Sequence, residues 1–138
     1  MNTSIIRLRI LLRILGVICV LAIVPLVMPF QWIDIAHQSM GLGPFPSAPI
    51  ADYLARSVSS LCAFYGGLLL MLARDVERYA PVISYQALAI MLLSAFGIVA
   101  GVRAGLPAFW FIADAFGCWL FLLPIFFLSR IVATTRPT

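Results

Sequence analysis

The sequence contains no lysine, and charged residues of any kind are scarce. Its nine basic residues are all arginines, five residues are acidic, and charged residues make up 10% of the chain. An ordinary soluble domain is about 25% charged and about 45–50% apolar. Hydrophobic residues here reach 64%, which is more than the core of so small a fold can remove from water. The composition therefore indicates an integral membrane protein.

The residues that hold metals and cofactors are also sparse. His37 is the only histidine, which excludes a haem held by two histidines of this chain and a histidine-rich metal site. Cys19, Cys62 and Cys118 form no C-x-x-C pair, so neither a zinc site nor a disulfide-exchange centre is indicated. We expect no cofactor and no metal. Nucleic-acid binding is not expected either, because the arginines lie scattered at the ends of apolar runs, as in membrane proteins.

Long apolar runs dominate the rest of the chain. A helix of about 20 apolar residues crosses the hydrocarbon layer of a membrane, and a helix satisfies its own backbone groups there, whereas an open strand does not. The sequence predicts one all-α transmembrane domain over residues 1–138, a four-helix bundle of up-down-up-down topology with an outer loop at 30–51. The predicted spans are 10–28, 53–72, 82–102 and 109–128.

The arginines predict the orientation of these spans. With the N-terminus inside, only Arg56 and Arg103 lie on the outer side, and the other seven arginines lie in the cytoplasm. Cytoplasmic segments of membrane proteins carry such an excess of positive charge. We therefore expect a multi-pass protein of the cell inner membrane with both termini in the cytoplasm.

Glycines mark the helix faces where close packing is expected. Gly97, Gly101 and Gly105 are spaced by four and would share one face of the third span, and Gly66 and Gly67 lie in the second. Small residues allow membrane helices to approach closely. We interpret these glycines as helix-packing positions within the chain, with self-association through the third span as the alternative.

Two charges fall inside predicted spans, where an ionised group is costly unless it is paired or faces water. Asp52 precedes Arg56 by four residues and is its expected local partner. Asp114 has no such neighbour, so we expect it to meet Arg56 or Arg103 from another helix. Two interpretations stay open: a structural ion pair that ties helices together, or an outward-facing polar pocket. The pocket would be lined by Asp34, His37, Arg56, Arg103 and Asp114.

One part of the chain resembles a known group of proteins. The segment from Tyr53 to Leu68 contains Arg56 and the Gly66-Gly67 pair, and it follows a run with Trp32, His37 and a Gly-Leu-Gly-Pro turn. These residues, and four spans in a chain of this length, resemble small uncharacterised bacterial membrane proteins that are DoxX-like in architecture. DoxX itself is associated with membrane oxidoreductase complexes, so the resemblance implies a possible redox association.

No pattern of catalytic residues accompanies these features, and we do not expect an enzyme. The sequence favours a non-catalytic accessory or structural component, whose partners are the lipid bilayer and another membrane protein or a second copy. Two alternatives stay open: an outer-face redox or ligand-binding protein of the DoxX-like type, and a small transporter that acts as a dimer. An apolar midplane in all four spans argues against transport, which usually needs a charge there.

Overall fold

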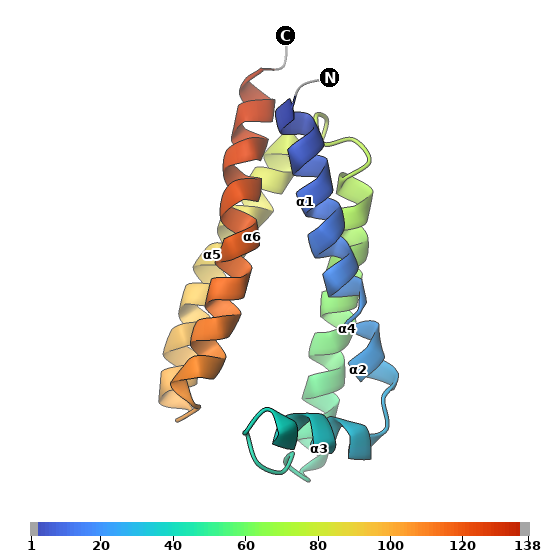
Figure 1. The fold of residues 1–138 in the computed structure, drawn as a ribbon, viewed down its shortest axis with the longest axis vertical. Helices are drawn as coiled ribbons and strands as arrows, with labels where there is room; N and C mark the ends of the chain where they lie inside the picture. The colour runs from blue at the N-terminus through green and yellow to red at the C-terminus, as the bar shows by residue number, and fades with distance from the viewer. Residues whose placement is uncertain (1–2, 136–138) are drawn as a thin grey trace. The chain divides into compact units, whose positions relative to one another are not determined.

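The structure, a computed structural model, describes residues 3–135, and all regular secondary structure in that range is helical. Four stretches are long and apolar enough to cross a membrane: Thr3–Val27, Pro49–Leu72, Ala80–Arg103 and Ala108–Thr134. The prediction of an all-α chain with four long apolar segments is thus confirmed. The helices (Figure 1) are α1 (Thr3–Val20), α2 (Ile23–Val27), α3 (Phe30–Ser39), α4 (Pro49–Leu72), α5 (Ala80–Arg103) and α6 (Ala108–Thr134).

The first predicted span, 10–28, differs most from the structure. The helix begins earlier, at Thr3, because arginine is a good helix former and the basic residues continue the helical turns. It also breaks at a turn of two residues that begins at Leu21. Pro25 explains the break, since its nitrogen carries no hydrogen to bond the Leu21 carbonyl. That carbonyl instead accepts the Val24 N–H at 3.0 Å.

The other spans keep their predicted positions with shifted ends. α4 starts at Pro49 instead of residue 53, since proline fits the first helical turn, where no N–H is needed. α5 has Pro81 in its own first turn. α6 continues to Thr134, past the predicted end at 128. Apolarity predicted the most apolar part of each helix, whereas the helices themselves run on into less apolar residues.

The described residues form two compact units. The terminal unit combines residues 3–14 with residues 70–135, and the central unit is Leu15–Leu69. The terminal unit has a core of side chains: Leu8 of α1, Val76 of the α4–α5 link, Ile83 of α5 and Ile125 of α6 are at most 1% exposed.

Hydroxyl and indole groups add polar contacts between α5 and α6. The buried Ser84 and Ser129 hydroxyls lie 2.7 Å apart and hydrogen-bond to each other. Farther along, the Trp119 Nε1–H donates to the Ser94 hydroxyl at 2.7 Å. Interhelical hydrogen bonds of this kind help membrane helices associate where the hydrophobic effect cannot.

The central unit is held by a close approach of two backbones. A Cβ atom built on Gly66 of α4 would lie 2.6 Å from the Gly16 carbonyl oxygen and 2.6 Å from the Val20 nitrogen of α1. Only a residue without a side chain fits at this crossing. The central unit also contains α2, α3 and the loop that leads to α4. Three of the five residues proposed above as a polar cluster lie in this unit: Asp34, His37 and Arg56.

Candidate functional site

Asp34 lies on α3 and binds the loop that follows it. Its Oδ1 atom accepts the backbone N–H of Phe45 at 2.7 Å, and its Oδ2 atom accepts from the Gln38 side chain at 2.9 Å. The pKa of Asp34 is lowered below its ordinary value, chiefly by the hydrogen bond from the Phe45 N–H and next by the hydrogen bond from Gln38. Both hydrogen bonds favour the ionised carboxylate. The carboxylate therefore holds the loop against α3.

His37 makes the second contact between α3 and the same loop. Its Nδ1–H donates to the Gly43 carbonyl oxygen at 2.8 Å, which fixes the ring orientation. The Phe45 ring packs edge-on against His37, with centroids 5.3 Å apart, and against Phe30, with centroids 5.7 Å apart. Asp34 and His37 are thus brought together by one loop, and both bind its backbone.

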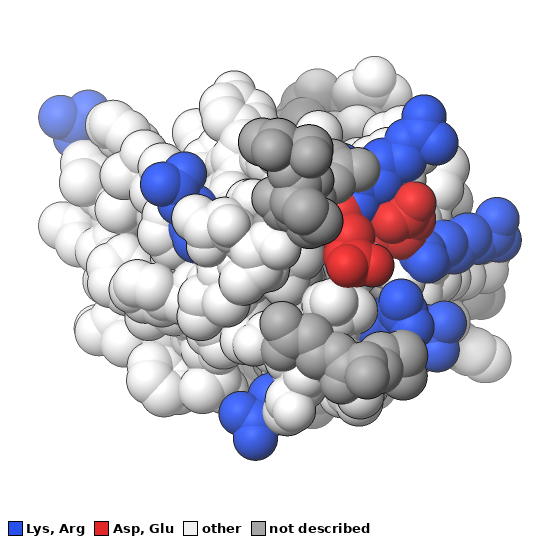
Figure 2. All heavy atoms as spheres, turned by 90° about the horizontal axis from the view of Figure 1, so that it is seen from above, with Lys and Arg blue, Asp and Glu red and all other residues white. Residues whose placement is uncertain are grey.

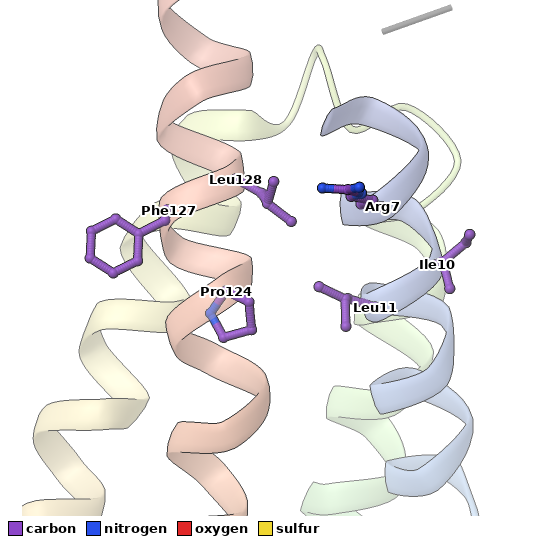
Figure 3. Close-up of a pocket in the computed structure, with 6 residues that line it drawn as sticks. All are labelled: Arg7, Ile10, Leu11, Pro124, Phe127 and Leu128. Carbon is purple, nitrogen blue, oxygen red and sulfur yellow. The ribbon is translucent and has the colours of Figure 1, made fainter. Parts of the chain in front are cut away.

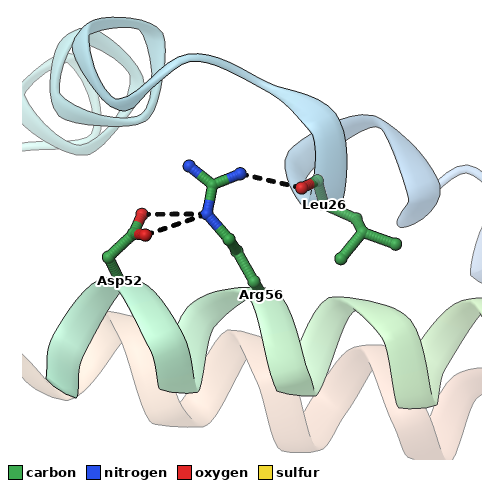
Figure 4. Close-up of polar contacts among 3 residues, drawn as sticks. All are labelled: Leu26, Asp52 and Arg56. Atoms are coloured by element: carbon green, nitrogen blue, oxygen red, sulfur yellow. Dashed lines mark hydrogen bonds and ion pairs between the residues drawn. The ribbon is translucent and has the colours of Figure 1, made fainter. Parts of the chain in front are cut away.

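Arg56 forms the expected ion pair with Asp52. Its Nε–H lies 2.9 Å from Asp52 Oδ2 and 3.1 Å from Oδ1, and the pair is half-buried. The guanidinium also donates from Nη1 to the Leu26 carbonyl oxygen at 2.8 Å (Figure 4). The sequence did not reveal this third contact. A signal was present, because the short α2 ends just before Pro29, and the last carbonyls of a helix need outside donors.

Arg103 and Asp114, the two cluster residues of the terminal unit, form no ion pair with each other within residues 3–135. Arg103 lies in the last turn of α5, and Asp114 lies about two turns into α6. Both side chains are exposed. The expected bond between Asp114 and Arg103 is therefore wrong. The alternative partner, Arg56, belongs to the central unit, and that pairing stays a prediction.

The five glycines predicted as packing positions divide into three groups. Gly66 and Gly101 do lie in close contacts, the former against the α1 backbone and the latter against the Phe111 side chain. Gly67 and Gly97 face open space in the part of the chain described. Gly105 follows the end of α5 with a φ of +67°, a left-handed conformation that suits glycine at a helix end, and its packing role stays a prediction.

Metal-binding side chains are not grouped in residues 3–135, where no set of three or more histidine, cysteine, aspartate or glutamate residues could hold an ion. Asp34, His37 and Arg56 each form a hydrogen bond to a backbone group. Comparison with known proteins found no matching family model, no matching curated protein and no matching solved structure. The DoxX-like resemblance therefore rests on the sequence features given above.

Proposed function

We propose that the chain is a multi-pass protein of the cell inner membrane and a non-catalytic component, either an accessory subunit or a structural bundle. The exposure of large apolar side chains on every long helix carries the proposal. Val17 is 51% exposed, Phe64 73%, Phe96 72% and Phe116 67%. Each belongs to a segment long and apolar enough to cross a membrane. Water disfavours such surfaces, and lipid tails do not.

The distribution of charge in the terminal unit supports an orientation with both termini in the cytoplasm. Arg7 lines one pocket with Leu128 of α6, and Arg130 lines another with Pro81 at the start of α5. The start of α1, the α4–α5 link and the end of α6 therefore lie at one end of the unit. Figure 2, viewed onto the end where the chain termini lie in Figure 1, shows acidic side chains among arginines. Arg103 is the last residue of α5 and therefore lies at the opposite end of that helix.

The contacts of the polar residues support a non-catalytic role. Asp34 and His37 hold the loop after α3, and Arg56 holds Asp52 and the end of α2. Each of these groups has a structural task of the kind that buried or half-buried polar groups require. The runner-up, an outer-face ligand-binding protein, is favoured by Arg103 and Asp114, because neither forms an ion pair in the described part of the chain.

Membrane insertion and orientation can be tested together. We expect the chain to stay with membranes during alkaline carbonate washing and to leave them only in detergent. A C-terminal fusion to green fluorescent protein should fluoresce, and a C-terminal fusion to alkaline phosphatase should be inactive. Recovery of the untreated chain as a soluble monomer would disprove the membrane proposal, and an active phosphatase fusion would disprove only the orientation.

The non-catalytic role needs variants that separate folding from activity. In cells whose own copy is deleted, Asp34→Asn and Arg56→Gln should reduce complementation only as far as they reduce the amount of folded protein. Arg13→Gln removes the same charge as Arg56→Gln from an exposed site outside the candidate cluster and serves as the matched control. A variant with normal amount and melting temperature but lost complementation contradicts a purely structural role and favours the runner-up.

A further inference from the structure

A groove of about 550 Å³ lies between α1 and α6 in the terminal unit. Its lining is apolar except at one position, and its volume lies in the range of pockets that hold small ligands. Figure 3 shows the side chains that border it, and the Arg7 guanidinium extends from α1 toward α6 at one end of the groove. The residues that line the groove are Arg7, Ile10, Leu11, Pro124, Phe127 and Leu128.

Along the groove, the charged side chain of Arg7 lies at one end and apolar side chains continue from it toward the middle of the helices. On α1, Arg7 is followed one turn deeper by Ile10 and Leu11. On α6, Phe127 and Leu128 lie just before Arg130. A molecule that fits the groove must therefore carry a negative group at its outer end and an apolar chain toward the interior of the span.

Arg7 is also available to a ligand. Within the described residues its side chain makes no hydrogen bond and no ion pair. The first turns of α1, the α4–α5 link and the last turns of α6 carry five described arginines (Arg7, Arg9, Arg74, Arg78 and Arg130) against two acids, Asp75 and Glu77. Asp75 already accepts the backbone N–H of Arg78 at 3.1 Å. Few carboxylates near Arg7 in the described part of the chain can therefore pair with its guanidinium.

We infer that this groove binds an anionic phospholipid. The headgroup phosphate binds the Arg7 guanidinium, and one acyl chain lies along Leu11, Pro124 and Leu128. Basic pockets between membrane helices bind anionic headgroups in this way, and arginine matches the geometry of a phosphate. The inference rests on the proposed membrane location and adds a specific lipid class to it.

Native mass spectrometry of the detergent-purified chain tests the inference. Phosphatidylglycerol and phosphatidylcholine with the same acyl chains are added in turn, and the affinity of the first bound lipid is compared. We expect a preference of about fivefold for phosphatidylglycerol, the effect of one cation near an anionic headgroup. Arg7→Gln should abolish the preference and Arg7→Lys should retain it. Arg103→Gln, which removes a charge at the opposite end of α5, should leave it unchanged.

Three results would overturn the inference: equal binding of the two lipids by the wild type, an unchanged preference in Arg7→Gln, or a dimer without lipid that Arg7→Gln dissociates. The last result would assign the groove to a second copy of the chain. Each can occur in a chain that carbonate washing leaves in the membrane, so failure of the lipid site is distinguishable from failure of the proposed membrane location.

Discussion

The terminal unit and the central unit are each stabilised by a different kind of internal contact. Among residues 3–135, every buried hydrophobic residue except Leu69 belongs to the terminal unit, where side chains of α1, α5 and α6 fill a common core. The central unit instead relies on the crossing of Gly16 and Gly66 and on hydrogen bonds to the loop after α3. A side-chain core can adjust to a small change by shifting rotamers, whereas two backbones in contact cannot.

The largest expected effect therefore comes from a single methyl group in the central unit. Gly66→Ala places Cβ 2.6 Å from two backbone atoms of α1, so the helices must separate. We expect the free energy of unfolding to fall by about 2–3 kcal/mol, measured by unfolding in mixed detergent and dodecyl sulfate micelles. The control, Gly67→Ala, faces open space and should stabilise α4 by up to about 1 kcal/mol. Equal losses in both variants would show that the crossing is not tight.

The matching change in the terminal unit should cost less. Gly101→Ala places Cβ 2.6 Å from the Phe111 ring and 2.8 Å from the Phe111 Cβ. The ring can rotate away, whereas the Phe111 Cβ moves only with its own backbone. We expect a loss of about 1 kcal/mol in the same assay, and none for the control Gly97→Ala. The loss should shrink in a Phe111→Ala background, which removes the ring and keeps only the Cβ contact. A loss as large as that of Gly66→Ala would show that the side-chain contact in the terminal unit is no more adaptable than the backbone crossing in the central unit.

A pH effect is expected in the central unit, at Asp34. The pKa of Asp34 is lowered in the folded chain, chiefly by the Phe45 N–H. A lowered pKa contributes stability that is present above the ordinary value of an aspartate, about 4, and is lost as the pH falls through the folded value. Hydrogen exchange at the Phe45 amide, corrected for its intrinsic rate, should therefore show less protection at low pH. Asp34→Asn should make that protection independent of pH, and a persistent pH dependence would assign it to another group.

The sequence predicted the helices well because apolar length is a property of side chains. It predicted the ion pair of Asp52 and Arg56 for the same reason, since both side chains are four residues apart on one helix. It missed the contacts to Leu26, Gly43 and Phe45, which use backbone groups. Every residue carries such groups, so no residue type marks them, and only the path of the chain brings them within reach.

The glycines illustrate the same limit. Spacing by four placed Gly97, Gly101 and Gly105 on one helical face, but α5 ends before Gly105. Only Gly101 meets a neighbour within the described residues. The spacing of glycines shows which face of a helix lacks side chains. The number of those glycines that contact a second helix depends on the angle at which that helix crosses.

The smallest expected effect is at Asp114. It forms no ion pair in the part of the chain described, so Asp114→Asn should change the free energy of unfolding by less than about 0.5 kcal/mol, as for other exposed substitutions. Arg56→Gln is the positive control, and it should lower the free energy of unfolding measurably because it removes the contacts with Asp52 and Leu26.

A loss of about 3–5 kcal/mol in Asp114→Asn would instead be the signature of a broken buried pair. In that case Arg56 is the candidate partner, and the Arg56→Gln, Asp114→Asn double variant should lose no more stability than the worse single variant. An additive loss would mean that the two residues act independently. The stability that Asp114 contributes would then come from contacts with groups other than Arg56.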